Sequence, residues 1–180
     1  MKKFLMTIAA AFAATTMSAQ IYVGGGLNLS SESYDGNSTS KISITPEVGY
    51  VLDENSALGL GIGFGMSGKD DSKKTEFSVN PYYRYNLVKT EKVNLFVDGS
   101  FTFKNTKGDG YTNKDYKENS WSIGVRPGVA VALNDKLSFV STMGLLGYKS
   151  SKPDGGEATN TFGLMDFSTL GLKFGLYYNF

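Results

Sequence analysis

The stretch LGLGIGFGM at residues 58–66 decides the fold, because apolar residues and glycines alternate along it without interruption. Strict alternation with a period of two is typical of a β-strand, in which successive side chains point to opposite faces of the sheet. One face of this strand carries Leu, Ile, Phe and Met, whereas the other carries only glycine. The stretch therefore predicts a strand with one bulky apolar face and one face that leaves room for other side chains.

Seven further runs of alternating residues surround this stretch. They cover residues 21–29, 41–50, 76–87, 93–103, 121–133, 137–148 and 170–180, and the run at 137–148 is the least regular. Each has roughly the length of 9–11 residues that crosses a bilayer as a tilted strand. Pro46, Pro81 and Pro127 lie inside three of the runs. Because proline removes a ladder hydrogen bond, we expect a bulge or a missing bond at each of them.

The connections between the runs alternate in length. Residues 53–56, 88–92 and 134–136 form short connections, whereas residues 31–40, 67–75, 105–119 and 149–160 are long, polar and charged. Short turns at one end and long loops at the other are typical of outer-membrane barrels, with the short turns and both termini on the periplasmic side. The sequence therefore predicts an all-β fold, an eight-stranded antiparallel up-and-down transmembrane β-barrel over residues 20–180, with four long extracellular loops.

The N-terminal residues 1–19 predict a cleavable signal peptide. Lys2 and Lys3 precede an apolar stretch at residues 4–14, and small residues follow up to Ala19, after which we expect cleavage and export to the periplasm. Removing the two lysines lowers the basic count from 18 to 16 against 17 acidic residues, so the formal net charge changes from +1 to −1. The mature chain therefore has no basic excess, which argues against nucleic acid as a partner.

Alternation alone does not say whether the apolar face meets lipid or a protein core. A soluble lipocalin-like ligand-binding barrel also has eight strands, with its apolar face inside. Here the second face carries mainly Gly, Ser, Ala and Asn, and most charged residues lie in the connections. Small residues suit the inside of a narrow barrel. An aromatic girdle at the lipid boundary is expected from Tyr50, Tyr83, Tyr85, Tyr178 and Phe180. The second face therefore favours an exterior in contact with outer-membrane lipid, and the soluble barrel is an alternative.

The signal peptide, the eight runs and the terminal Tyr177-Tyr178-Asn179-Phe180 resemble the small outer membrane protein β-barrel domain family, the OmpA/OmpX-like and "porin family" eight-stranded barrels. The resemblance covers essentially all of residues 20–180 and implies a monomer in the cell outer membrane of a Gram-negative bacterium. In that family the outer-membrane assembly machinery reads the alternating final strand and closes the barrel. The resemblance assigns this role to Leu172, Phe174, Leu176, Tyr178 and Phe180, which are also expected to face lipid.

Five charged residues fall on the inward face of the expected strands. They are Glu47, Arg84, Asp98, Arg126 and Lys173. Charges in a confined interior are costly unless they pair, so the cluster favours a structural plug inside the barrel. An alternative is a narrow gated pore for small solutes, opened by breaking a Glu47–Arg126 or Asp98–Arg84 pair. Because an eight-stranded interior is normally packed, the sequence favours a structural and surface-interaction protein over a pore.

Enzyme functions are disfavoured by what the sequence lacks. The chain has no His and no Cys, so the usual His-dependent triads and dyads cannot form. Asp70, Asp71 and Asp109 do not have the spacing of a calcium loop. We therefore expect no catalysis, no cofactor and no metal. Activity is expected in the loops, where an unknown extracellular ligand would meet the exposed aromatic candidates Tyr34, Tyr111 and Tyr116.

Overall fold

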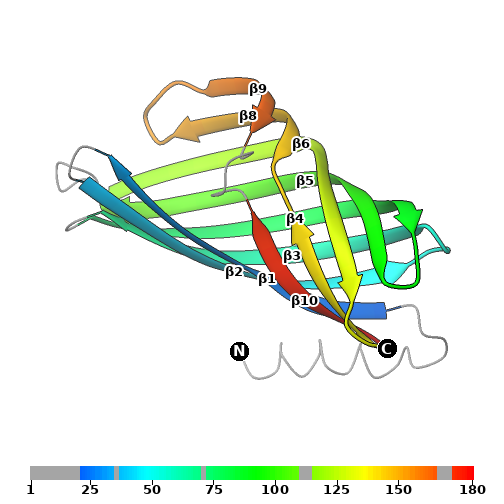
Figure 1. Cartoon of the computed structure of the whole chain (residues 1–180). Helices are drawn as coiled ribbons and strands as arrows, with labels where there is room; N and C mark the ends of the chain where they lie inside the picture. The colour runs from blue at the N-terminus through cyan, green and yellow to red at the C-terminus, as the bar shows by residue number, and fades with distance from the viewer. Residues whose placement is uncertain (1–20, 35–36, 70–71, 110–114, 166–171) are drawn as a thin grey trace, which may run out of the picture.

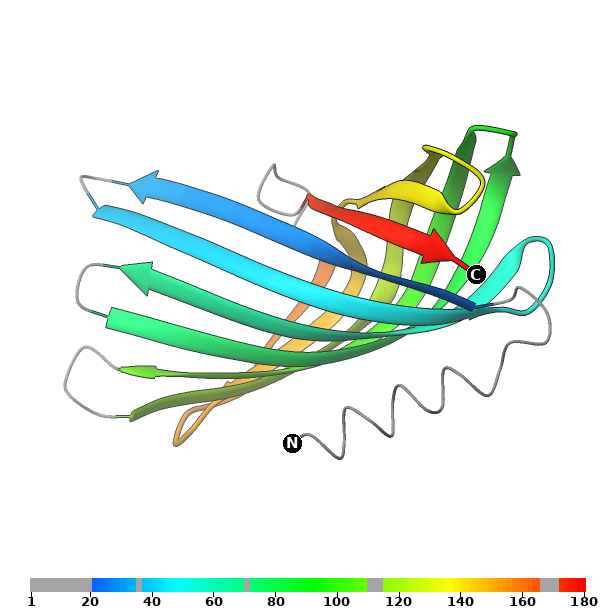
Figure 2. The ribbon, with the colours of Figure 1, turned by 90° about the horizontal axis from the view of Figure 1, so that it is seen from below.

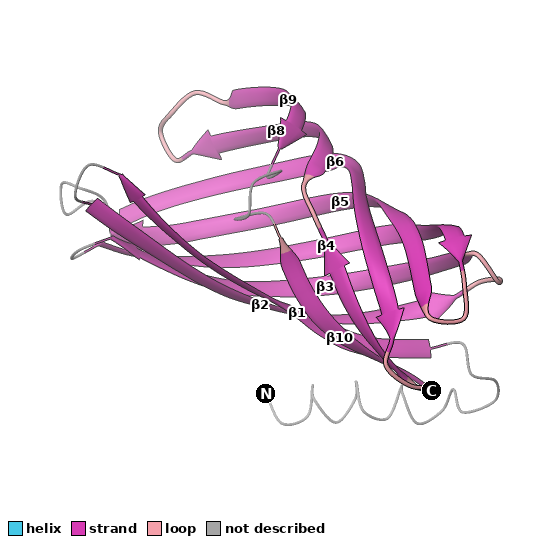
Figure 3. Ribbon diagram, in the orientation of Figure 1, coloured by secondary structure: helices cyan, strands magenta, loops and turns pink. Residues whose placement is uncertain are grey.

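The computed structural model describes residues 21–34, 37–69, 72–109, 115–165 and 172–180, and nearly all of them lie in β-strands (Figure 3). The expected signal peptide lies outside these residues. No helix in the described part of the chain is long and apolar enough to cross a membrane.

Ten strand segments follow one another along the described part of the chain. They are β1 (Ile21–Tyr34), β2 (Asn37–Val51), β3 (Ser56–Lys69), β4 (Ser72–Lys89), β5 (Val93–Asp109), β6 (Asp115–Ala132), β7 (Leu137–Thr142), β8 (Leu145–Pro153), β9 (Thr159–Met165) and β10 (Lys173–Asn179). Eight of them form a ring in the order β5-β4-β3-β2-β1-β10-β7-β6, which closes because β6 also pairs with β5. Figures 1 and 2 show these strands inclined around a common axis. The fold is therefore the eight-stranded closed antiparallel barrel that the alternation predicts.

Segments β8 and β9 continue the last two strands of the ring. β7 pairs with residues 128–132 of β6, and β8 pairs with residues 118–125 of the same strand, so β7 and β8 are two halves of one interrupted strand. The interruption falls at Met143 and Gly144, where Gly144 adopts a positive φ of 63° that favours glycine. β8 pairs with β9 just as β7 pairs with β10. The break explains why the run at 137–148 alternates least regularly.

The three prolines interrupt the ladder as expected. Pairing between β2 and β3 skips Pro46, and pairing between β4 and β5 skips Pro81, without a change of register in either case. Pro127 lies opposite the break between β7 and β8, where its carbonyl oxygen accepts a hydrogen bond from the Met143 backbone nitrogen at 3.1 Å. The register between β4 and β5 also shifts at a bulge between Asn86 and Val88, which the alternation did not predict.

The connections expected to be long loops are instead mostly strand, so this prediction was wrong. Pairing between β1 and β2 continues to Tyr34 and Asn37, and pairing between β5 and β6 continues to Asp109 and Asp115. β4 and β6 each have 18 residues, well beyond the length needed to cross a bilayer. Ladder hydrogen bonds join backbone groups and need no apolar side chains, so the hairpins continue past the end of the apolar alternation. We call this end of the barrel the hairpin end, and the end with connections 52–55, 90–92 and 133–136 the turn end.

The apolar face points outward along the whole ring. Leu60 and Met66 of the alternating stretch are 39% and 59% exposed, and Tyr50, Tyr83, Tyr85, Tyr178 and Phe180 are all exposed near the turn end. Phe64, Ile44 and Ile123 are exposed on neighbouring strands. A soluble barrel would bury these residues, so the lipocalin-like alternative is wrong.

Large rings inside the turn end pack across glycines of the neighbouring strand. Each of four inward rings lies directly opposite a glycine: Tyr22 opposite Gly49, Tyr82 opposite Gly59, Phe96 opposite Gly128 and Tyr177 opposite Gly24. A Cβ atom added at Gly59 would overlap the Tyr82 ring. Gly59 of the opening stretch is therefore needed for close approach, because it makes space for a ring that fills the barrel.

Candidate functional site

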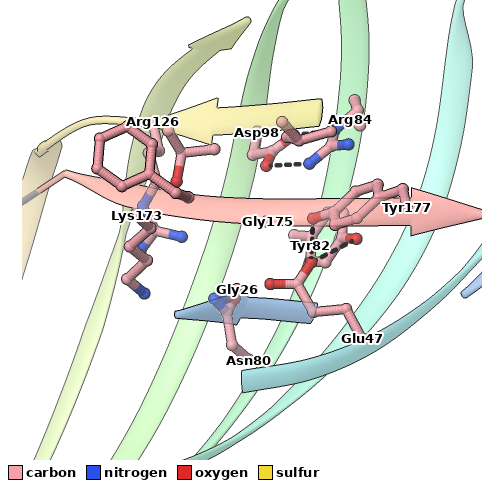
Figure 4. A pocket seen from close by; sticks show the side chains of 13 residues that line it. Gly26, Glu47, Asn80, Tyr82, Arg84, Asp98, Arg126, Lys173, Gly175 and Tyr177 are labelled. Carbon is pink, nitrogen blue, oxygen red and sulfur yellow. Dashed lines mark hydrogen bonds and ion pairs between the residues drawn. The ribbon is translucent and has the colours of Figure 1, made fainter. Parts of the chain in front are cut away.

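A buried ion pair joins two neighbouring strands in the interior at the turn end. Arg84 of β4 and Asp98 of β5 are directly opposite in the ladder and are only 7% and 3% exposed. The guanidinium donates two hydrogen bonds, from Nε to Oδ1 at 2.8 Å and from Nη2 to Oδ2 at 2.9 Å (Figure 4). This parallel two-bond geometry is the strongest way in which Arg can hold a carboxylate. It brings together two of the five charged residues that the sequence assigns to the interior.

Aromatic rings surround the Arg84 guanidinium. Its central carbon lies 3.8 Å from the centroid of the Phe96 ring, 5.2 Å from that of Tyr82 and 5.3 Å from that of Tyr177. A cation near a ring face is attracted by the ring quadrupole, and the attraction strengthens when water is excluded. The rings therefore both stabilise the charge and fill the space around it.

Glu47 of β2 is held by tyrosine hydroxyls rather than by an arginine. Its Oε2 atom accepts hydrogen bonds from Tyr82 at 3.0 Å and from Tyr177 at 2.5 Å. The Tyr82 hydroxyl also lies 2.8 Å from that of Tyr22. The Glu47–Arg126 pair considered from the sequence is therefore replaced by a network of hydroxyls. Tyrosine hydroxyls at inward positions could have suggested these partners.

Arg126 and Lys173 lie on the other side of the same interior. Arg126 is directly opposite Asp98 in the ladder, but its Nε donates to the Gly144 carbonyl oxygen at 3.3 Å. Figure 4 shows Arg126 and Lys173 together, apart from Glu47 and its tyrosines. All five predicted interior residues line one small cavity of about 20 Å³. This volume has room for about one water molecule, so the turn end of the barrel is nearly filled.

The hairpin end of the barrel holds a much larger cavity of about 450 Å³. Glu76 forms a second charge cluster on its wall, with its Oε2 atom 2.8 Å from Lys41 Nζ and 3.5 Å from Lys104 Nζ. These three residues occupy positions on the inward face of the alternating strands. The sequence prediction missed the cluster because it placed loops next to these positions, where the structure has continuous strands. Among the described residues, no group of three or more His, Cys, Asp or Glu side chains could hold a metal ion.

The candidate loop tyrosines do not share one environment. Tyr116 lies in β6 on the inward-facing side, where its hydroxyl donates to Glu118 at 2.6 Å and Lys74 Nζ lies 4.5 Å from its ring centroid. The expectation that Tyr116 lies in a loop was wrong, because β6 begins at Asp115. Tyr34 is the last residue of β1, and Tyr111 lies outside the described residues.

The final strand presents most of its predicted residues outward. Phe174, Leu176, Tyr178 and Phe180 are exposed, and the Phe139 and Phe174 rings stack at 5.9 Å across β7 and β10. Leu172 differs, because it precedes β10 and is half-buried, with its carbonyl oxygen accepting a hydrogen bond from the Asn28 side chain at 2.6 Å. Leu170 lies outside the described residues.

A closed antiparallel barrel with an apolar exterior and a polar, charged interior defines a transmembrane barrel. The model of the outer membrane protein beta-barrel domain matches residues 4–180. The chain belongs to this family and is located in the outer membrane.

Solved structures of bacterial outer-membrane barrels resemble the chain. Neisserial surface protein A has a TM-score of 0.56 at 15% identity, covering 89% of this chain and 97% of that one. A major outer membrane protein from Thermus thermophilus has a TM-score of 0.53 at 14% identity, covering 91% and 100%. Ail, the attachment invasion locus protein of Yersinia pestis, has a TM-score of 0.50 at 14% identity, covering 90% and 97%. These likenesses show the shared fold. No curated protein sequence matches the chain.

Proposed function

We propose that this barrel is a non-enzymatic structural and surface-interaction protein whose contacts are made by the extracellular hairpin end. The observation that carries the proposal is the filled turn end, where the Arg84–Asp98 pair and its surrounding rings leave only about 20 Å³. Solutes cannot diffuse through an interior filled in this way. The barrel therefore acts as an anchor, and its activity lies in what it displays outside the membrane.

The hairpins provide a display of paired strands. Trp121 and Tyr148 are in aromatic contact on the outward face, and we assign this pair to the aromatic girdle at the outer lipid boundary. Beyond this level β5 and β6 continue as a ladder that places exposed Lys107 directly opposite exposed Lys117. Polar strands held above the lipid are suited to contacts with external molecules. Two proteins of this fold are named as a surface protein and as an attachment invasion locus protein, which agrees with such a role.

Conductance in planar bilayers tests the plug. We expect the purified barrel to show little or no conductance, both unmodified and as the Asp98→Asn variant. Stable conductance steps of the unmodified barrel would contradict the proposal. Steps that appear only in Asp98→Asn would instead support the gated pore, which stays an alternative prediction.

Shortening one hairpin tests the display. Thr106 and Glu118 are directly opposite in the ladder, so a two-residue turn can replace residues 107–117 and keep the β5–β6 pairing below it. We expect cells that carry the shortened barrel to lose adhesion to an immobilised panel of glycans and matrix proteins. A matched control replaces residues 134–136 of the short turn by another turn sequence. Equal adhesion of the shortened and control barrels, at equal surface amounts, would argue against the proposal.

A further inference from the structure

The cavity at the hairpin end has a basic lining. Among the described residues, five cationic side chains line it: Lys41, Lys104, Arg126, Lys149 and Lys173. Two carboxylates, Glu76 and Glu118, line it as well. Five positive and two negative charges give these residues a net charge of +3. The cavity of about 450 Å³ is within the range of about 300–1,000 Å³ that small-molecule sites occupy.

We call the boundary of this cavity with the small cavity at the turn end its floor, which Arg126 and Lys173 line. Both carboxylates already have partners other than these two residues. Glu76 accepts the ammonium groups of Lys41 and Lys104, and Glu118 accepts the Tyr116 hydroxyl. Below the floor, Asp98 is held by two bonds from Arg84, and Glu47 by two tyrosine hydroxyls. These four carboxylates are therefore committed to other donors, and the described residues that line the cavity have a positive excess.

Arg126 occupies the boundary between the two cavities, because it lines both of them. Its Nε is directed to the Gly144 carbonyl oxygen, which the break between β7 and β8 makes available. An arginine side chain has five N–H donors in a planar fork, and this bond uses one. The fork matches the geometry of phosphate and carboxylate oxygens better than a lysine ammonium does. Hydroxyl groups of Ser120, Ser122 and Thr102 line the cavity wall further toward the hairpin end.

We infer that the floor of this cavity binds a phosphate group, with Arg126 as the principal ligand, Lys173 beside it and Lys149 on the wall toward the hairpin end. The phosphate belongs either to a soluble phosphorylated solute that enters from outside the cell or to the headgroup of an outer-leaflet lipid. The site goes beyond the proposed role of the hairpins, since it lies inside the barrel and does not need their outer surface.

Titration calorimetry of the refolded barrel tests the site. The soluble probes are inorganic phosphate and glucose 6-phosphate, added to the barrel in a non-ionic detergent. The lipid arm compares binding of a phosphorylated glycolipid with that of its dephosphorylated form in nanodiscs. Arg126→Gln removes the fork, whereas Lys152→Gln removes one positive charge from an exposed residue of β8 that does not line the cavity. Heat-modifiable migration on gels confirms that each variant is folded.

We expect saturable binding of at least one probe to the unmodified barrel, weakened at least about tenfold by Arg126→Gln and unchanged by Lys152→Gln. Binding of the soluble probes alone would identify a solute site, and binding of the glycolipid alone would identify a lipid site. The inference is overturned if no probe binds saturably. It is overturned equally if folded Arg126→Gln binds like the unmodified barrel, or if Lys152→Gln weakens binding as much.

Discussion

At the scale of single residues, the interior of this barrel is organised around one buried cation. Arg84 is held by Asp98 on the neighbouring strand and packed between aromatic rings. Burying two charges is costly, but removing one partner leaves the other unpaired in a medium of low polarity, which costs more. The pair therefore specifies which side chains fill the turn end, although it adds little net stability.

Replacing Asp98 by Ala should lower the free energy of unfolding by about 3–5 kcal/mol, because it leaves the Arg84 guanidinium buried and unpaired. Urea titration of the barrel in lipid vesicles measures the change. Glu76→Gln is the matched control: its partners are partly exposed, and loss of such a pair should cost at most about 1 kcal/mol. Equal effects of the two substitutions would show that the buried pair has no special weight.

The pairing of rings with glycines makes a second residue-scale prediction. Gly59→Ala should destabilise the barrel by about 1–3 kcal/mol, because the new Cβ would overlap the Tyr82 ring. At Gly61 the added Cβ would meet the Thr45 and Glu47 side chains at 3.2 and 3.3 Å, so Gly61→Ala should cost less. Urea unfolding compares the two variants. If Gly61→Ala proves the more damaging, the ring packing is not what requires glycine.

At the scale of elements, each short connection at the turn end is closed by a side-chain oxygen. Asp53 Oδ1 accepts the Asn55 backbone N–H, Thr90 Oγ1 accepts that of Val93, and Asn134 Oδ1 accepts those of Lys136 and Leu137. Such side-chain acceptors replace missing backbone bonds in tight turns. They keep these connections short, whereas the opposite ends of the strands continue as long hairpins.

Asp53 makes turn stability depend on pH. The Asn55 backbone N–H lowers the pKa of the Asp53 carboxyl below its ordinary value. A lowered folded-state pKa contributes stability that is present above the unfolded-state pKa and is lost as the pH falls through the folded-state pKa. Urea titrations from about pH 7 down to about pH 2 should therefore show Asp53→Ala losing its stability deficit at the acid end. A deficit that stays constant with pH would rule out the charged form as the acceptor.

The final strand makes the other element-scale prediction, on the proposed assembly signal. Phe180→Ser should reduce the amount of barrel assembled in cells severalfold and leave refolding in detergent nearly unchanged, because only assembly in cells requires recognition. Leu133→Ser is the control, since Leu133 is 56% exposed and Phe180 57%. Heat-modifiable migration of membrane fractions and of refolded samples measures both. If Leu133→Ser reduces assembly equally, Phe180 acts only as a residue that faces lipid.

At the scale of the whole molecule, the two faces of the ring have different surroundings. Lipid contacts the bulky apolar residues, and the narrow interior is filled with polar groups and rings at one end and holds a cavity at the other. Leu60→Arg places a charge on the lipid face, and we expect a cost of about 2–4 kcal/mol or failure to assemble. Urea unfolding and membrane fractionation measure the effect, with Leu60→Met as the control. Normal assembly and stability of Leu60→Arg would contradict the assigned orientation.

The expected cleavage after Ala19 is a further property of the whole chain. We expect the protein extracted from outer membranes to begin at Gln20, because residues 1–19 have the charged, apolar and small-residue order of an export signal. Intact-mass spectrometry of the purified protein measures this. A mass that retains Lys2 and Lys3 would show that the segment is not removed.

The sequence by itself determined the number of strands, the face that meets lipid and five of the charged residues that line the interior. A period of two specifies the side of a strand on which each residue lies, so these properties follow from parity. Only the tertiary structure decided the partners: Asp98 lies opposite both Arg84 and Arg126 in the ladder but binds Arg84. It also decided that the hairpins extend the strands. Backbone pairing does not require an alternating pattern of apolar side chains, so a polar sequence does not reveal it. The glycines of residues 58–66 illustrate both contributions. Alternation in the sequence placed them on the inward face, whereas only the strand register in the structure placed Tyr82 opposite Gly59.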